Sequence, residues 1–153
     1  MPQSVKEQAL LLLERRDYGR DELAAKLVEK GAGPEEAAAV AGRMVELGYV
    51  NDANYASMVA RHYAARGFGP GRVRDELRRR RVPREYWDDA LGQLPDDGEA
   101  AYRCLCARLR GRAASPEELR RASAALSRRG FSWEEIRPAL ERYKSEFDSR
   151  EEA

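Results

Sequence analysis

The chain has 153 residues, of which 36% are charged, and its formal net charge is only +1. Mean hydropathy is −0.75, and Ala, Leu, Arg and Glu outnumber the β-branched residues, a composition typical of helical proteins. No apolar run approaches the roughly 20 residues that span a bilayer. These features argue against a membrane partner and predict a water-soluble protein that stays in the cytoplasm.

The predicted helices start with residues 4–16, where Ser4 can cap the first turn and Glu7 follows three residues later. The segments 15–47, 65–94 and 111–143 then align with one another, which indicates an internal repeat. In each segment an apolar pair is followed by a basic turn and a further helix. The aligned apolar pairs are Leu23 and Leu27, Val73 and Leu77, and Ala122 and Leu126. The basic turns are Lys30-Gly31, Arg80-Arg81 and Arg129-Gly130.

Proline and serine mark where several of these helices begin. Proline is tolerated in the first turn of a helix, where its missing N–H would have no partner in any case. Three prolines suit such a position: Pro34, Pro70 and Pro116. Ser115 followed by Glu118 matches a capping box, as does Ser132 followed by Glu135. With one further helix before each aligned segment, the sequence predicts nine helices in three groups of three.

The predicted fold class is all-α, with three tandem three-helix repeats over 1–50, 51–95 and 96–147 and an acidic tail over 148–153. Because a three-helix unit buries little apolar surface alone, we expect neighbouring repeats to pack end to end. The resulting body should be elongated and curved, with a long surface rather than a deep pocket. Since the repeats supply their own packing partners, we also expect a monomer.

Positive charge is concentrated in two stretches that the small net charge conceals. Residues 61–84 contain nine arginines against two acidic residues, a formal +7, and residues 103–129 contain eight against two, a formal +6. One or two cations at a helix C-terminus satisfy the helix dipole, each contributing about 0.3–1 kcal/mol, whereas residues 78–81 are all arginine. The excess favours contact with a polyanion or an acidic protein, and the alternative is a solvated helix face. Arg80 lies nearest the apolar side, so its stem should follow the core while its head reaches water.

Residues that carry enzyme chemistry are sparse. The chain has a single histidine, and Cys104 and Cys106 would lie about 200° apart on a helix, so they cannot bridge or share a metal. A Gly-rich phosphate loop, an HExxH sequence and a nucleophile elbow are all missing from the sequence. We therefore expect no enzymatic activity, no cofactor and no metal.

Four motifs occur in order along residues 5–143: ALLLLERRDYGRDELAAKLVEKG, LGYVNDANYA, GFGPGRVRDEL and LSRRGFSWEEI. In type and spacing they resemble the RecX family of bacterial regulators of the RecA recombinase. The sequence departs from the family at Gly19, where a small hydroxyl residue is frequent, and at Arg80-Arg81-Val82, which replaces a Lys-Gly-Ile turn. Glycine is itself an acceptable helix cap, and Pro83 still ends the second helix.

The resemblance implies a RecX-like negative regulator that binds within the groove of the RecA filament on DNA. It would inhibit the ATPase, strand-exchange and coprotease activities of RecA, and so act in DNA repair, homologous recombination and the SOS response. We expect weak DNA binding without sequence specificity, because the arginines can neutralise phosphates but few side chains could read bases. The residues predicted to contact RecA or DNA are Arg72, Arg74, Arg78, Arg79, Arg81, Arg84, Arg128 and Arg129. In the second motif, Tyr49 and Tyr55 should pack between repeats and Asp52 should cap a helix.

Two alternative functions stay open. Short helices separated by tight turns imitate the helix-turn-helix of a DNA-binding transcription regulator, although no repeat is distinguished as a reader and no dimerisation segment is recognisable. A non-enzymatic adaptor that uses its repeats to hold another protein is the second alternative. A large preference for one duplex over unrelated duplexes would identify the regulator. Absence of any effect on RecA filaments would favour the adaptor.

Overall fold

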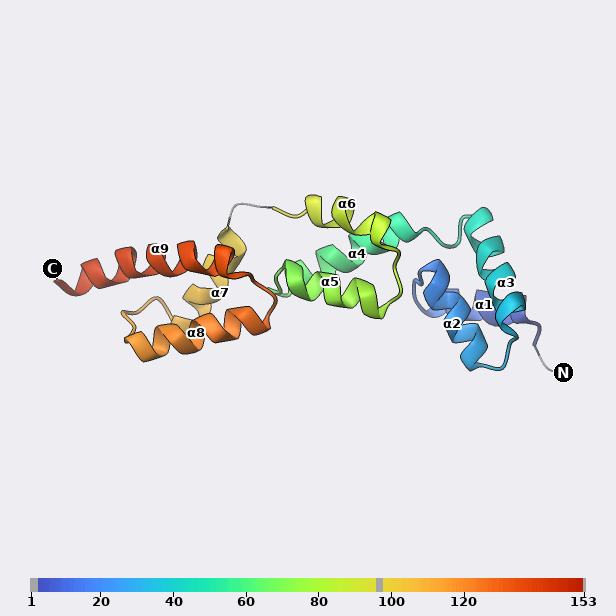
Figure 1. Cartoon of the computed structure of the whole chain (residues 1–153), viewed down its shortest axis with the longest axis horizontal. Helices are drawn as coiled ribbons and strands as arrows, with labels where there is room; N and C mark the ends of the chain where they lie inside the picture. Colours follow the sequence, from blue (N-terminus) through green and yellow to red (C-terminus); the bar gives the residue numbers. More distant parts are fainter. Residues whose placement is uncertain (1–2, 96–97, 153) are drawn as a thin grey trace. The chain divides into compact units, whose positions relative to one another are not determined.

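The computed structural model describes residues 3–95 and 98–152, with side chains up to residue 147, and over these ranges it contains nine α-helices and no strand. Figure 1 shows the helices in three consecutive triplets. The first triplet is α1 (Val5–Arg15), α2 (Arg20–Glu29) and α3 (Pro34–Glu46). The second is α4 (Asp52–Ala65), α5 (Pro70–Arg79) and α6 (Trp87–Gly92), with a short 3-10 helix, η1 (Arg84–Tyr86), before α6. The third is α7 (Glu99–Leu109), α8 (Pro116–Arg128) and α9 (Trp133–Glu152).

These triplets confirm the predicted all-α fold of three three-helix repeats. The helices group into two compact units, Met1–Val59 with Glu76–Ala90 and Ala60–Asp75 with Leu91–Ala153. Because the division falls inside α4, α5 and α6, the second triplet contributes to both units. The repeat boundaries given above stay a prediction, and the predicted acidic tail lies outside the side chains that the structure describes.

The core of the first unit lies among α1, α2 and α3. Leu23, Leu27 and Met44 are completely buried in it. Ala37 and Ala41 of α3 are also completely buried, and their small side chains allow α2 and α3 to pack closely. Burying each large apolar side chain contributes roughly 1.5–3 kcal/mol, so this cluster stabilises the first triplet and positions the residues around it.

The core of the second unit lies among α7, α8 and α9. Leu105, Leu126 and Ile136 are buried there beside Tyr143. The Tyr143 hydroxyl donates to backbone carbonyls at the end of α7, those of Leu109 and Arg112, and so the buried phenol is satisfied. Burial raises the pKa of this hydroxyl, which keeps it protonated and able to donate.

The positions aligned from sequence are equivalent in the structure. Each is at most 1% exposed: Leu23, Leu27, Val73, Leu77, Ala122 and Leu126. The turns after them also share a hydrogen bond to the second apolar residue, from Ala32 N to Leu27 O at 3.0 Å, from Val82 N to Leu77 O at 3.0 Å, and from Phe131 N to Leu126 O at 3.1 Å. The backbone is left-handed at the same point of each turn, with φ of 109° at Gly31, 59° at Arg81 and 100° at Gly130.

The predicted helix starts are confirmed at the prolines and at the serine caps. The first residues of α3, α5 and α8 are Pro34, Pro70 and Pro116. Ser115 and Glu118 exchange hydrogen bonds of 3.1 and 3.3 Å, and Ser132 and Glu135 exchange bonds of 3.3 and 3.0 Å. Ser4 accepts from the backbone N–H three residues later at 3.1 Å. These contacts fix the ends of helices that carry the charged surface.

Candidate interaction surface

The arginine run begins in the last turn of α5 and ends in the turn that follows it. Leu77 is completely buried, which leaves Arg78 and Arg79 exposed on the outer faces of the helix. Arg81 then adopts left-handed backbone with φ of 59°, where the other triplets have glycine. Such a conformation costs a residue with a Cβ about 1–2 kcal/mol. The side chain of Arg81 is exposed and forms no hydrogen bond or ion pair with the described residues, so no local contact offsets this cost.

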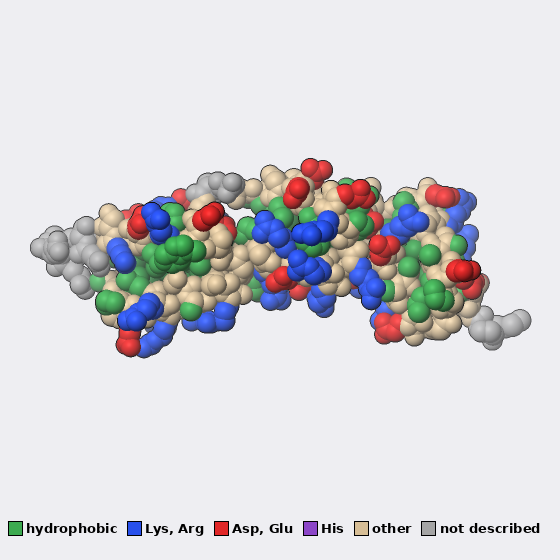
Figure 2. All heavy atoms as spheres, in the orientation of Figure 1, with side chains coloured by type: hydrophobic (Ala, Val, Ile, Leu, Met, Phe, Trp, Pro, Cys, Tyr) green, Lys and Arg blue, Asp and Glu red, His purple; other side chains and the backbone are tan. Residues whose placement is uncertain are grey.

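Trp87 positions two arginines at the surface of the first unit. Its indole N–H donates to the Val82 carbonyl at 2.9 Å, and the residue is only 6% exposed, so the ring is fixed. The guanidinium carbons of Arg78 and Arg84 lie 5.4 and 5.2 Å from the ring centre. Cation–π contacts contribute about 0.5–1 kcal/mol each at exposed sites, so they orient both groups while leaving their charge accessible. Figure 2 shows Lys and Arg side chains gathered over this α5 and α6 part of the molecule.

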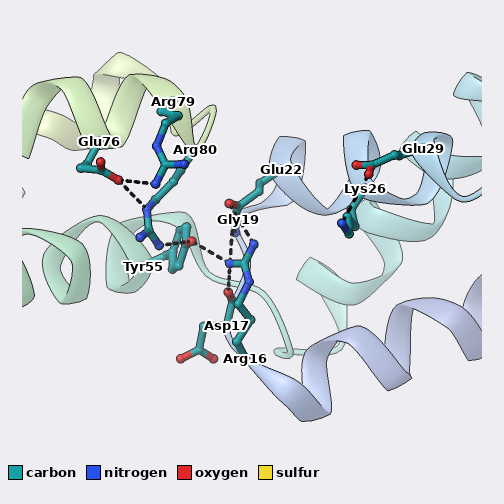
Figure 3. Close-up of polar contacts among 10 residues, drawn as sticks. All are labelled: Arg16, Asp17, Gly19, Glu22, Lys26, Glu29, Tyr55, Glu76, Arg79 and Arg80. Atoms are coloured by element: carbon teal, nitrogen blue, oxygen red, sulfur yellow. Dashed lines mark hydrogen bonds and ion pairs between the residues drawn. The ribbon is translucent and has the colours of Figure 1, made fainter.

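A buried carboxylate organises the other arginines of the run (Figure 3). Glu76, 5% exposed, accepts from Arg79 Nη2 at 2.8 Å and from Arg80 Nε at 3.3 Å. The side chain of Arg79 remains 68% exposed, whereas that of Arg80 is 23% exposed and also donates to the Tyr55 hydroxyl at 2.9 Å. The side chain of Arg80 is thus only partly exposed, and the prediction that its head reaches water stays a prediction. Its guanidinium is positioned by Glu76 and Tyr55, and the buried carboxylate thereby gains a cationic partner.

Tyr55 extends this network to the first triplet, as Figure 3 shows. Its hydroxyl also accepts from Arg16 Nη1 at 3.2 Å, and Arg16 Nη2 pairs with Glu22 Oε2 at 3.2 Å. Tyr55 is 3% exposed, and burial raises the pKa of its hydroxyl. Two guanidinium groups from different triplets thus meet at one phenol oxygen within the first unit.

Asp52 caps a helix that lies earlier in the chain than its own. Its Oδ1 accepts the backbone N–H of Arg20 at 2.9 Å, at the start of α2 and 32 residues away in sequence. Gly19 is the N-cap residue of α2, and a Cβ at Gly19 would lie only 2.8 Å from Asp52 Oδ1. The carboxylate therefore satisfies a first-turn N–H of α2, whose own N-cap residue has no side chain.

Tyr49 differs from the other two residues of its motif, because it is 58% exposed. The expectation that it packs between repeats is wrong. After α3 the chain turns through Gly48, with φ of 84°, and Val50 occupies the buried position, at 3% exposure. The ring of Tyr49 is consequently left on the surface.

The second unit holds the other predicted contact residues, and three of them differ in exposure. Arg74 and Arg128 are exposed. Arg72 is half-buried, with its guanidinium carbon 5.0 Å from the ring centre of Phe68 and 5.6 Å from that of Tyr63. The sequence predicted the same role for these three arginines, but of the three only Arg72 packs against aromatic rings.

Arg129 has a structural role that the sequence did not reveal. Its Nε donates to the Gly67 carbonyl at 3.1 Å and its Nη2 to the Arg66 carbonyl at 2.7 Å. The guanidinium carbon also lies 4.4 Å from the ring centre of Phe68. Arg129 therefore holds the turn after α4, and its predicted role in binding a partner stays a prediction.

Within the first unit, the structure brings together Arg78, Arg79, Arg81 and Arg84 around the end of α5 and the start of α6. Glu76, which positions part of this set, was missed, although an acidic residue three and four positions before two arginines is a recognisable helix ion-pair spacing. Fixed guanidinium forks recognise carboxylate or phosphate oxygens. The surface is thus suited to binding an anionic partner by charge.

The fold and this surface define a class, the all-helical repeat proteins with an arginine-rich face. Residues 6–44 match the model of the first three-helix domain of RecX, and residues 51–91 match that of the second. Regulatory protein RecX of Chromohalobacter salexigens is 33% identical over 136 residues, which cover 88% of this chain and 90% of that protein. Regulatory protein RecX of Trichlorobacter lovleyi is 37% identical over 141 residues, which cover 88% of this chain and 92% of that protein.

This chain belongs to the RecX family, whose named relatives above are regulatory proteins. Among solved structures, RecX from Lactobacillus salivarius superposes with a TM-score of 0.78 over 92% of this chain and 94% of that one, at 20% identity, which supports the same fold. None of the described helices combines the length and the apolar character needed to cross a membrane.

Proposed function

We propose that this chain binds the RecA filament formed on DNA and inhibits its ATPase, strand-exchange and coprotease activities. Family membership supports the partner, and the single structural observation that supports the surface is the group of exposed arginines around the end of α5, which are Arg78, Arg79, Arg81 and Arg84. Within this group, Arg81 is an exposed arginine in left-handed backbone that forms no hydrogen bond or ion pair with the described side chains, so it keeps a cost that glycine would remove. Strain of this kind is common at functional sites, but Arg110 has the same left-handed backbone, with φ of 61°, so the strain alone does not identify the surface. The proposal includes a monomer that acts in the cytoplasm.

Each unit carries its own set of proposed contact arginines. Those of the first unit are Arg78, Arg79, Arg81 and Arg84, and those of the second are Arg72, Arg74 and Arg128. Direct DNA binding should be weak and independent of sequence. Its logarithmic affinity should fall with the logarithm of salt concentration by about 0.7 per neutralised phosphate on single strands. Tight binding that hardly responds to salt would contradict an electrostatic surface.

The test is RecA ATPase activity on single-stranded DNA, measured while the protein is titrated in, with RecA from the same organism. In the test variant Arg74, Arg78, Arg79 and Arg81 are replaced by Gln, which is nearly as good a helix former as Arg. Arg80 is kept, so Glu76 retains a cationic partner at 3.3 Å. We expect the concentration for half-inhibition to rise about tenfold or more, since rim charges govern such encounters.

A matched control replaces Arg103, Arg108, Arg110 and Arg112 by Gln. It removes the same charge from exposed positions of the second unit, and it also includes one left-handed residue, Arg110, with φ of 61°. Inhibition by the control should stay close to that of the unchanged protein. Thermal unfolding identifies any loss of fold in either variant, and undiminished inhibition by a folded test variant would reject the α5 surface.

A further inference from the structure

A second surface, distinct from the arginine face, lies between α8 and α9 in the second unit. It is a groove of about 700 Å³, with Leu119 and Leu140 lining it and Trp133 beside them. Both leucines pack partly against the core of the unit, so the groove is a rigid outer face of that core. Figure 2 shows hydrophobic side chains gathered between the positions of these two helices, with basic side chains next to them.

The exposure of Trp133 is what makes this groove unusual for the chain. The protein has two tryptophans, and Trp87 is 6% exposed with its indole N–H bonded to a backbone carbonyl. Trp133 is 59% exposed, although it opens α9 next to a buried cluster. An exposed tryptophan beside partly buried leucines is typical of a protein-binding site. In such sites a few aromatic residues contribute most of the binding free energy.

The polar side chains of the groove give it a positive charge. Arg120 and Lys144 both line it, and neither forms an ion pair with any side chain that the structure describes. The neighbouring arginines differ: Arg121 lies 3.6 Å from Glu117, and Arg137 lies 3.3 Å from Glu141. Since the described lining includes no carboxylate, the groove combines an apolar floor with two available cations.

We propose that the α8–α9 groove binds an acidic amphipathic helix of a partner protein. The apolar face of that helix would rest on Leu119, Leu140 and Trp133, and its carboxylates would pair with Arg120 and Lys144. The stretch of α8 along the groove, residues 116–123, rises about 10 Å, or two helical turns, which matches anchors at i, i+3 or i+4, and i+7. A nucleic-acid strand fits less well, because the floor is mainly aliphatic and strand binding depends on stacked aromatic rings.

The experiment uses the full chain and a fluorescein-labelled synthetic helix with leucines at i, i+3, i+4 and i+7 and glutamates on its other face. Anisotropy titrations should show binding in the micromolar range, and Trp133→Ala should weaken it about 30-fold, the effect of losing a central anchor. A second variant, Arg120→Glu with Lys144→Glu, should weaken it about tenfold and should prefer a peptide with lysine in place of glutamate. Arg103→Glu with Arg108→Glu, on exposed positions of α7, is the charge-matched control and should change affinity less than twofold.

Each result bears on the groove alone, because neither RecA nor the arginine face takes part. Circular dichroism and thermal unfolding establish that the variants are folded, and the charge reversal still tests the groove if Trp133→Ala is not. The proposal is overturned if the unchanged protein does not bind the acidic peptide, or if folded groove variants bind it as well as the control does. Displacement of the peptide by labelled oligothymidylate, with oligothymidylate binding that depends on Trp133, would assign the groove to nucleic acid instead.

Discussion

The contact between the first and second helix triplets includes hydrogen bonds between polar side chains, whereas that between the second and third adds to the side chain of Arg129 two direct hydrogen bonds between backbones. In the first, two arginines from different triplets, Arg16 and Arg80, donate to the hydroxyl of Tyr55 at 3.2 and 2.9 Å. Asp52 adds a hydrogen bond of 2.9 Å to the backbone of Arg20. All of these residues belong to the first compact unit. This contact therefore depends on charge balance and on long side chains.

The second contact uses glycines that leave no room for a side chain. Gly69 N donates to Arg129 O at 2.8 Å, and Gly71 N donates to Gly130 O at 2.9 Å, all within the second unit. A Cβ at Gly130 would lie 2.3 Å from the backbone nitrogen of Arg72, and one at Gly69 would lie 2.7 Å from the carbonyl of Gly130. We therefore expect different mutations to disrupt the two contacts. Removal of a charged side chain should disrupt the first, and addition of a methyl group at a glycine should disrupt the second.

The largest effect is expected for Gly130→Ala. The added Cβ meets the Arg72 backbone at 2.3 Å in a residue with φ of 100°, so backbone strain and overpacking together should cost about 4 kcal/mol of unfolding free energy. Urea denaturation measures this loss. Gly31→Ala is the matched control, because Gly31 has φ of 109° in the same turn of the first triplet but nothing lies within 4 Å of its Cβ. Its cost should be only about 1–2 kcal/mol, and equal losses at the two sites would contradict a tight backbone contact.

The next effect concerns the buried carboxylate of the first contact. Glu76→Ala removes the buried carboxylate that pairs with Arg80, whose side chain is 23% exposed, and breaking such a buried ion pair should cost about 3 kcal/mol. Glu46→Ala is the control, since the Arg43–Glu46 pair has the three-residue spacing of the Glu76–Arg79 pair and a similar distance, 2.9 Å against 2.8 Å, but its side chains are 57% and 68% exposed. An exposed pair contributes less than about 1 kcal/mol. Urea denaturation measures the loss of unfolding free energy in each variant. Losses of similar size would show that the buried Glu76 ion pairs stabilise the fold no more than an exposed pair does.

The sequence predicted the helix triplets well and these contacts poorly, for a physical reason. Leu23 and Leu77 were identified as core because helix periodicity is a local signal, and both are completely buried. The approach of Gly69 to Gly130 could not be predicted, because it depends on missing side chains in segments that are distant in sequence. Arg129 was predicted as part of the interaction surface, yet its guanidinium binds backbone carbonyls 62 and 63 residues away. Charge patterns reveal which residues are cationic, and only packing determines which of them are available.

A smaller effect, of opposite sign, is expected at the turn that follows α5. Arg81→Gly should raise the free energy of unfolding by about 1 kcal/mol, because glycine adopts the left-handed conformation without steric cost. The same turn has glycine beside each of the other two triplet cores, at Gly31 and Gly130. If Arg81 contacts RecA, this stabilised variant should also inhibit RecA ATPase less well. Arg110→Gly, at φ of 61°, should gain similar stability and keep its inhibition, and a destabilised Arg81→Gly protein would contradict the strain argument.

The smallest expected effect is a pH dependence of stability that arises from the first contact, because the helix cap Asp52 in that contact is a titratable group. Burial raises the pKa of this carboxyl above its ordinary value, and the nearby negative charge of Asp21 raises it further. The hydrogen bond from Arg20 N lowers the pKa, but by less than burial raises it. The folded state therefore favours the protonated acid, so this contribution to stability is present below the unfolded pKa near 3.8 and is lost as pH rises through the folded pKa.

Asp52→Asn keeps an oxygen for Arg20 N and does not titrate, so the stability of the unchanged protein relative to this variant should increase as pH falls from 6 toward about 3.5. Asp52→Ala, which removes the cap, should be less stable by about 1 kcal/mol at pH 7. A relative stability that decreases on acidification, measured by urea denaturation across this range, would mean that the cap favours the charged carboxylate and that the helix dipole of α2 outweighs burial.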